Sequence, residues 1–197
     1  MIPEGHYIDV GDNFRFHYYD EGNGETVLFL HGSGTGVSGH TNFKRNFVAL
    51  RDAGFRVILQ DLPGFGFSSK PDNVAYSMDY FNGKLIEFAD ALELNQFSLI
   101  GNSLGGALSL GLSLNKPERI KKLILMGSGG IEDMETYNSM PGIQKLLSDF
   151  LGGEMNQEKI EGLLKLFPYD SSIITDEMIE DRICLLYTSD AADDTLC

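Results

Sequence analysis

The stretch SLIGNSLGG, residues 98–106, places a serine between glycines where a strand-like run meets a helix-like run. Residues 101–105 match the pattern G-x-S-x-G, in which a sharp strand-to-helix turn exposes a nucleophilic serine. The turn is tight and the helix packs closely on the strand, so glycines are needed on both sides. The pattern predicts Ser103 as a nucleophile. The alternative is an ordinary strand-to-helix turn with Ser103 as the helix N-cap.

A second glycine-rich stretch, LHGSGTG at residues 30–36, follows the apolar run TVLFL. It lacks the Lys-Ser/Thr pair of a phosphate-binding P-loop and the spacing of a dinucleotide-binding loop. Instead, a backbone N–H from this loop and that of Leu104 could stabilise negative charge developing on a substrate oxygen. One such donor is worth about 3 kcal/mol of the barrier. This assignment makes His31 a residue that organises the loop rather than a base.

The composition suits one sizeable domain and excludes several classes of partner. The 197 residues carry a formal net charge of −14, so no basic stripe is available to bind the phosphates of a nucleic acid. No apolar run reaches the roughly 18 residues that a membrane-spanning helix needs. The N-terminus MIPEGHYIDV lacks the basic and apolar regions of a signal peptide. We therefore expect neither nucleic-acid nor membrane partners.

Both cysteines, Cys184 and Cys197, lie in the last fourteen residues. The cysteine-free body excludes a disulfide scaffold and a thiolate metal site. It also fits a reducing compartment, so we expect a cytoplasmic protein.

Strand-like runs occur at residues 7–10, 14–20, 26–30, 56–60, 97–101 and 120–127. The near-continuous apolar character of the later runs fits a sheet covered on both faces. Helical patterns separate them: Phe81, Leu85, Phe88 and Leu92 recur at helical spacing, and another helix is expected from Leu104 to shortly before residue 117. This alternation predicts parallel strands joined by helices, preceded by an antiparallel hairpin.

After residue 130 the pattern becomes purely helical. Apolar residues at 143–151 and at 160–167 repeat with helical periodicity, and Thr175 precedes two acidic residues, as at a helix start. Three amphipathic helices without a strand suggest a lid over the sheet. We expect a core at residues 1–130, a helical lid at 131–183 and a non-native tail at 184–197.

Four stretches in this order resemble the α/β-hydrolases: LHGSGTGVSGHTNFKRN, RVILQDLPGFGFSSKP, LIGNSLGGALSL and PERIKKLILMGSGG. More narrowly, they resemble the meta-cleavage product hydrolases, which cut carbon–carbon bonds in ring-opened aromatic compounds. The lid stretches MPGIQKLLSDF and LLKLFPYDSSIITDEMIEDR support the narrower match. One departure is Thr35, where the family usually has proline. The implied fold is α/β, a mostly parallel sheet with a helical lid.

The resemblance also implies site residues. Ser103 would be the nucleophile, and the N–H groups of Ser33 and Leu104 would form the oxyanion hole. Asn42, Asn102 and Arg182 match polar positions that in this family hold the carboxylate and keto end of a dienoate substrate. Gly32 and Gly34 would line the substrate. An arginine suits a carboxylate because it can form two charge-assisted hydrogen bonds.

Each polar position has an alternative. Asn102 could point away from the substrate, Asn42 could cap a helix beginning near Phe43, and Arg182 could be a solvated lid residue paired with Asp181 or Glu177.

In the implied mechanism the dienol first becomes its keto tautomer. The serine, activated by histidine, then attacks the carbonyl and releases a carboxylic acid and a 2-hydroxydienoate. The resemblance implies no metal or organic cofactor, a small-molecule substrate and a homo-oligomeric parent. Two other functions stay open: a carboxylesterase on the same fold, and a binding protein without catalysis.

The four histidines all precede Ser103, whereas in this fold the triad acid and histidine follow the serine. No strand-like run follows residue 127 either, so we expect the last two strands of the fold to be missing and the strand at 120–127 to form an exposed apolar edge. The tail CLLYTSDAAD resembles a translated sequencing adapter, the alternative being a divergent natural C-terminus. We expect a fragment that folds poorly and is inactive.

Overall fold

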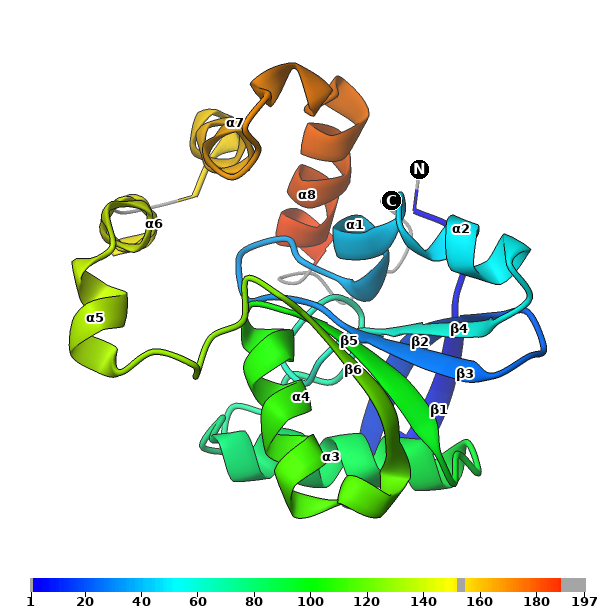
Figure 1. Ribbon diagram of the computed structural model, residues 1–197. Coiled ribbons are helices and arrows are strands. Elements are labelled where there is room, and N and C mark those ends of the chain that lie inside the picture. The colour runs from blue at the N-terminus through cyan, green and yellow to red at the C-terminus, as the bar shows by residue number, and fades with distance from the viewer. Residues whose placement is uncertain (1, 152–154, 189–197) are drawn as a thin grey trace.

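The computed structural model describes residues 2–151 and 155–188 (Figure 1). Its centre is a six-stranded sheet in the order β1-β2-β4-β3-β5-β6. The strands are β1 (His6–Val10), β2 (Phe14–Glu21), β3 (Thr26–Leu30), β4 (Arg56–Gln60), β5 (Phe97–Asn102) and β6 (Ile120–Met126). Each lies within one residue, at either end, of the range that the apolar runs predict.

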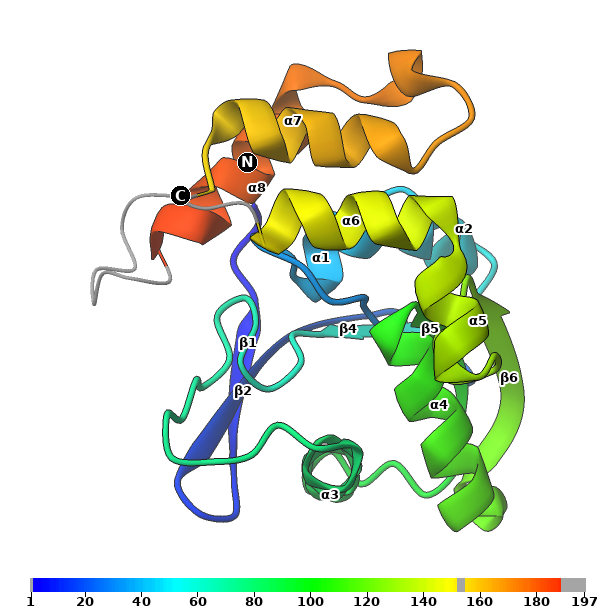
Figure 2. The same ribbon diagram turned by 90° about the vertical axis from the view of Figure 1, so that its left-hand side faces the viewer.

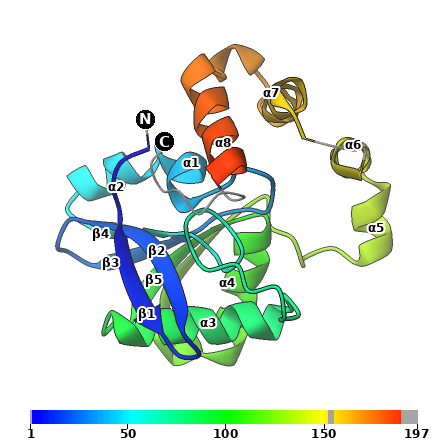
Figure 3. The same cartoon turned by 180° about the vertical axis from the view of Figure 1, so that it is seen from behind.

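The sheet is parallel where helices separate its strands and antiparallel where a hairpin begins the chain. β4, β3, β5 and β6 run parallel, whereas β2 pairs antiparallel with both β1 and β4. Figure 3 shows the β1–β2 hairpin in front of the remaining strands. The predicted hairpin and parallel units are therefore confirmed.

Helices cover both faces of this sheet. On one face lie α1 (Gly39–Phe43) and α2 (Phe47–Asp52), and on the other lie α3 (Met78–Ala91) and α4 (Leu104–Asn115) (Figure 1). A short 3₁₀ turn (Pro117–Arg119) follows α4 and leads into β6. Side chains alternate between the faces along each strand: Leu28 packs with the α3–α4 core, and its neighbour Phe29 packs with the α1–α2 core. Two apolar layers thus hold the strand ends in place.

The segment predicted as a lid, here called the lid, follows β6, and its regular structure in residues 131–151 and 155–188 is helical. It comprises α5 (Met134–Ser139), α6 (Pro141–Leu151), α7 (Gln157–Leu166), a 3₁₀ turn (Ser171–Ile173) and α8 (Asp176–Thr188). These helices extend from the end of the sheet where the parallel strands finish, with α8 beside α1 and α6 beside α7 (Figures 1 and 2). Ile160, Leu164 and Ile179 form a small core between α7 and α8.

Of the two predicted segment boundaries, one falls in a loop and the other inside a helix. Residue 130 lies in the loop before α5, whereas residue 183 lies inside α8, which continues to Thr188. Positions 189–197 of the expected tail are outside the described residues. Within residues 2–151 and 155–188, no strand follows β6, and no helix has the length and apolar character to cross a bilayer. β6 forms an edge of the described sheet, with Ile124 and Met126 exposed.

Candidate active site

Ser103 occupies a strained turn between β5 and α4. Its backbone has φ 51° and ψ −111°, a combination that residues with a side chain rarely adopt. Main-chain bonds hold the turn: Ser103 N donates to Met126 O over 3.0 Å, and Ser103 O accepts from Gly129 N over 3.1 Å. The Ser103 side chain makes no capping hydrogen bond to α4. The capping alternative therefore loses its support, and the strain favours a nucleophile.

The glycines around Ser103 are required by close backbone packing. A Cβ added at Gly105 would clash with the carbonyl oxygen of Leu30, at the end of β3. One added at Gly101 would clash with the carbonyl oxygen of Gly105. The first turn of α4 thus lies directly against the strand that leads into the 30–36 loop.

That loop lies against the serine. A Cβ added at Gly32 would stand 3.2 Å from Ser103 Cβ. The residues that follow this pair, Ser33 and Leu104, are those predicted to donate to an oxyanion. Neither main-chain N–H has an acceptor among the described residues, and Leu104 N belongs to the unpaired first turn of α4. Two free donors therefore flank the serine.

Asn42 connects the loop to the elbow. Its Oδ1 accepts a hydrogen bond from Gly32 N over 2.9 Å and another from Asn102 Nδ2 over 3.1 Å. α1 begins at Gly39 and Ser38 caps it through a bond from Thr41 N, so the alternative in which Asn42 caps a helix beginning near Phe43 is wrong.

The Asn102 side chain turns toward Asn42. The alternative in which it points away from the predicted site receives no support.

His31 is held as a neutral, structural side chain. Its Nδ1 donates to Gly32 O over 2.7 Å, and its Nε2 accepts from Leu62 N over 2.9 Å. Burial lowers its pKa below the ordinary histidine value. Because both ring nitrogens are engaged, His31 organises the loop, as the sequence predicts. Gly32 N donates to Asn42 and Gly32 O accepts from His31, so both main-chain polar groups of Gly32 are already hydrogen-bonded. A substrate could meet Gly32 only through van der Waals contact.

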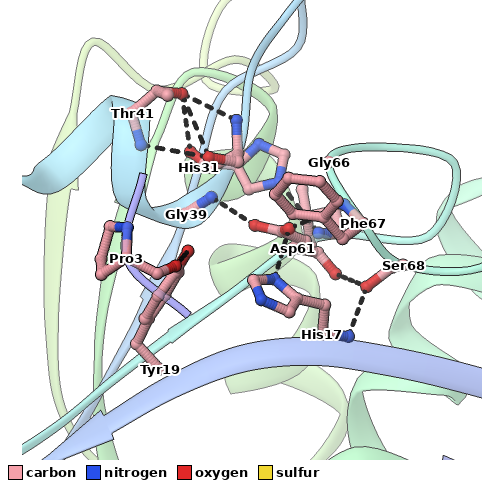
Figure 4. Close-up of polar contacts among 12 residues, drawn as sticks. Pro3, His17, Tyr19, His31, Gly39, Thr41, Asp61, Gly66, Phe67 and Ser68 are labelled. Carbon is pink, nitrogen blue, oxygen red and sulfur yellow. Dashed lines mark hydrogen bonds and ion pairs between the residues drawn. The ribbon is translucent and has the colours of Figure 1, made fainter. Parts of the chain in front are cut away.

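A buried cluster around Asp61 fixes the other side of the loop (Figure 4). The carboxylate is fully buried and accepts from Gly39 N (2.7 Å), from Phe67 N (2.9 Å) and from His17 Nδ1 (2.8 Å). Ser68 Oγ donates to the Asp61 carbonyl oxygen over 2.7 Å. These bonds join β2, the end of β4 and the start of α1.

The Asp61 cluster was not singled out from the sequence. The available signal was an acidic residue that directly follows the strand-like run RVILQ and precedes two glycines. Together with His31, Asp61 leaves α1 and the loop little freedom to move.

None of the four histidines is hydrogen-bonded to Ser103 Oγ in the described part of the chain. His17 is paired with Asp61, and both ring nitrogens of His31 are hydrogen-bonded to the main chain. His40 is buried on α1, and this burial lowers its pKa. His6 lies exposed on β1. These residues supply no base for the serine.

Arg182 reaches the loop from the lid. Its Nη1 donates to Thr35 O over 3.4 Å, and its main chain packs against Gly36, where an added Cβ would clash with Arg182 O. Burial lowers the pKa of the guanidinium to about 10, and it stays charged at neutral pH. Asp181 and Glu177 pair with Lys44 instead, so the alternative of Arg182 paired with these acids is not supported.

Gly34 and its neighbours line a pocket of about 680 Å³. Its other walls come from residues 64–66, from Lys70 and Asp72, and from Leu185 and Leu186 of α8. Ser103, Asn102 and Arg182 do not line this pocket, so it does not test the predicted substrate-lining role of Gly34.

Comparison with known proteins identifies the family to which this fold belongs. Residues 25–159 match the family of the alpha/beta hydrolase fold. The chain belongs to the α/β-hydrolase fold family. The predicted family and fold class are thereby confirmed, and the G-x-S-x-G turn occupies the position that this hydrolase family gives its nucleophile.

Within the α/β-hydrolases, the chain is similar to enzymes that act on ring-fission products. It is 41% identical over 174 residues to a 2-hydroxy-6-oxononadienedioate/2-hydroxy-6-oxononatrienedioate hydrolase of Comamonas testosteroni, covering 86% of this chain and 59% of that protein. It is also 41% identical over 175 residues to a 2-hydroxy-6-oxo-6-phenylhexa-2,4-dienoate hydrolase of Burkholderia cepacia, with the same coverage. The chain thus spans 59% of the length of these two relatives.

Solved structures of the same fold also include meta-cleavage product hydrolases. A meta-cleavage product hydrolase from Pseudomonas fluorescens IP01 matches with a TM-score of 0.81 at 32% identity, covering 98% of this chain and 65% of that chain. A hydrolase from Rhodococcus sp. strain RHA1, at 24% identity and a TM-score of 0.77, shares the fold. The resemblance to meta-cleavage product hydrolases predicted from the sequence is confirmed.

Proposed function

We propose that this chain carries the nucleophile and the substrate-binding residues of a serine hydrolase of the meta-cleavage product type. Such an enzyme would cleave a C–C bond in 2-hydroxy-6-oxo-dienoate-like products of aromatic catabolism. The observation that carries the proposal is the strained Ser103 beside the unpaired N–H groups of Ser33 and Leu104. The names of the similar proteins from Comamonas and Burkholderia support this substrate class.

The geometry suits a substrate with a carboxylate at one end. Arg182 supplies a buried positive charge near Thr35, and Asn42 and Asn102 lie near Gly32, at the start of the same loop. The P. fluorescens structure named above is a complex with acetates. After ketonisation, Ser103 Oγ would attack the carbonyl at the scissile bond, and Ser33 N and Leu104 N would hold the oxyanion.

The attack needs a base, and none of the four histidines is placed to be one. The proposal therefore requires a histidine from outside this sequence. Without a base, only oxyanion stabilisation and binding would remain, about 10³–10⁴-fold over water at best.

The first experiment is to sequence the gene across codon 183 from source DNA by a method without transposon adapters. The encoded protein is then assayed with 2-hydroxy-6-oxo-6-phenylhexa-2,4-dienoate and with p-nitrophenyl esters. Loss of the dienol absorbance at a higher kcat/KM than ester hydrolysis supports the proposal. Faster turnover of the esters would assign a carboxylesterase, and the tail CLLYTSDAADDTLC in genomic DNA, with no histidine after Ser103, would favour a binding protein without catalysis.

We further propose a cytoplasmic location and a small-molecule substrate as the partner. The cysteine-free stretch of residues 1–183 supports a reducing compartment. The acidic net charge of −14 supports a partner other than nucleic acid.

A further inference from the structure

Two asparagines of this chain are directly followed by glycine: Asn23 by Gly24, and Asn82 by Gly83. In such a pair the main-chain nitrogen of the glycine can attack the side-chain amide carbon of the asparagine, because glycine has no side chain that hinders the approach. The reaction needs a glycine nitrogen that is free of a hydrogen bond and an asparagine side chain that is open to water. The two pairs differ in both respects.

The first pair meets these conditions. Asn23 and Gly24 are exposed in the turn between β2 and β3, outside any helix or strand. Within residues 2–151 and 155–188, neither the Asn23 side chain nor the Gly24 N–H has a hydrogen-bond partner. The nitrogen and the amide carbon that must meet are therefore both available.

The second pair is protected by α3. Asn82 and Gly83 lie inside this helix, whose geometry commits the Gly83 N–H to the carbonyl oxygen four residues earlier. The Asn82 side chain is buried, and its Nδ2 lies beside α4, where a Cβ added at Gly111 would stand 2.7 Å from it. The same dipeptide thus occurs once in a reactive setting and once in a protected one.

We propose that Asn23 is a site of spontaneous deamidation and that the fold protects Asn82 from the same reaction. The Gly24 nitrogen bonds to Cγ of Asn23 and gives up its proton, and the side-chain amide nitrogen leaves as ammonia. Water then opens the resulting cyclic imide at one of its two carbonyls. The product is aspartate or isoaspartate, in which the main chain runs through the side-chain carbon. Ser103 takes no part, so the inference does not depend on the proposed function.

Isoaspartate should disturb the turn because the turn packs tightly. A Cβ added at either Gly22 or Gly24 would clash with main-chain carbonyl oxygens of residues 54 and 55. Isoaspartate lengthens the main chain between these two glycines by one methylene. The turn also leads into the β3–β4 pairing, which begins where Arg56 N donates to Glu25 O over 3.1 Å. We expect the modification to weaken this end of the pairing.

The test incubates the chain in mildly alkaline buffer and, in parallel, in concentrated urea. Peptide mass spectrometry follows each asparagine, since conversion of an amide to an acid raises the mass of its peptide. In buffer, Asn23 should react at least about tenfold faster than Asn82, because a helix interior frees its amides only through local unfolding. In urea the two rates should agree within about threefold, because the helix no longer protects Asn82.

Asn95 is the matched control for the role of glycine. It is exposed outside any helix or strand, as Asn23 is, but Gln96 follows it, so it should stay intact during the same incubation. Equal rates at Asn23 and Asn82 in buffer, or an Asn23 that does not react, would overturn the proposal. A slow Asn82 in urea would assign the difference to neighbouring residues and refute protection by α3.

Asn23→Gln tests the consequence for stability. Glutamine would have to form a larger ring, which closes slowly, so this variant should keep its mass and its urea midpoint throughout the incubation. The midpoint of the wild-type chain should fall as isoaspartate accumulates, which labelling by an isoaspartyl methyltransferase measures. An unchanged midpoint in the modified wild-type chain would refute the predicted weakening of the β3–β4 pairing.

Discussion

The main-chain N–H of Gly32 donates to Oδ1 of Asn42 over 2.9 Å, and this bond fixes the loop that lies against Ser103. The same oxygen accepts from Asn102, so one amide group holds both glycine-rich turns of the site. The arrangement explains why a polar residue is needed within α1, where the sequence alone also allowed a helix cap.

Asn42→Ala should therefore destabilise the chain. It leaves the partly buried donors of Gly32 and Asn102 without an acceptor, at a cost of about 1–3 kcal/mol in the free energy of unfolding. Urea denaturation measures the change. Asn46→Ala is the matched control, because Asn46 is exposed and its side chain makes no capping bond to α2. Equal loss in both variants would show that the Asn42 bonds contribute nothing particular.

Gly105→Ala should destabilise by about 1–3 kcal/mol or more, because the new Cβ clashes with the main chain of Leu30. Gly83→Ala provides the opposite case within α3, since a Cβ there meets nothing within 4 Å. It should stabilise by about 0.5–1 kcal/mol through the helix preference of alanine. Thermal or urea unfolding of the two variants tests the close packing at the elbow, and a neutral Gly105→Ala would contradict it.

Ser103→Gly should be more stable than Ser103→Ala by about 1 kcal/mol. Alanine keeps the Cβ that makes φ 51° costly, whereas glycine adopts such a backbone without strain. Both variants lack the hydroxyl, so the comparison isolates the backbone. If Ser103→Ala were the more stable of the two in urea, the turn would store no strain.

Stability should fall between about pH 7 and pH 5. Burial lowers the pKa of His31 and of His40, so the folded state keeps them neutral while the unfolded chain takes up protons below its histidine pKa of about 6.5. This stability is fully present above that pKa and is lost as the pH falls, by up to about 1.4 kcal/mol per pH unit for each group. Urea midpoints across this range measure it.

Two variants test whether His31 contributes to this pH dependence of the unfolding free energy. His31→Gln should make the slope shallower, because His40 alone then contributes to it, and the surface variant His6→Gln serves as the control. A slope unaffected by His31→Gln would show that His31 does not contribute.

The sequence predicts the four parallel strands well because buried parallel strands have a near-continuous apolar pattern. The two runs of the N-terminal hairpin also match β1 and β2. Between β3 and β4 the sequence allowed only a helix beginning near Phe43, whereas the structure has α1 and α2, which are five and six residues long and too short for helical periodicity to show. α5 was missed for the same reason.

At the site, the motif around Ser103 was enough to predict the strand-to-helix turn, and the separate stretch LHGSGTG was enough to predict the loop. The roles of Asn42 and Asp61 were not readable, because their partners lie far away along the chain. Gly32 precedes Asn42 by 10 residues, and His17 precedes Asp61 by 44. Only the packing of α1 between the strand ends brings these atoms together.

The contact between Lys44 and Asp181 spans 137 residues, whereas Asn42 and Asn102 are 60 apart. Contacts between distant parts of a chain close larger loops and form later in folding. A nascent chain that emerges N-terminus first can form the six described strands and the turn at Ser103 before α8 exists. We therefore expect the Arg182 end of the candidate site to be assembled after the turn that holds Ser103.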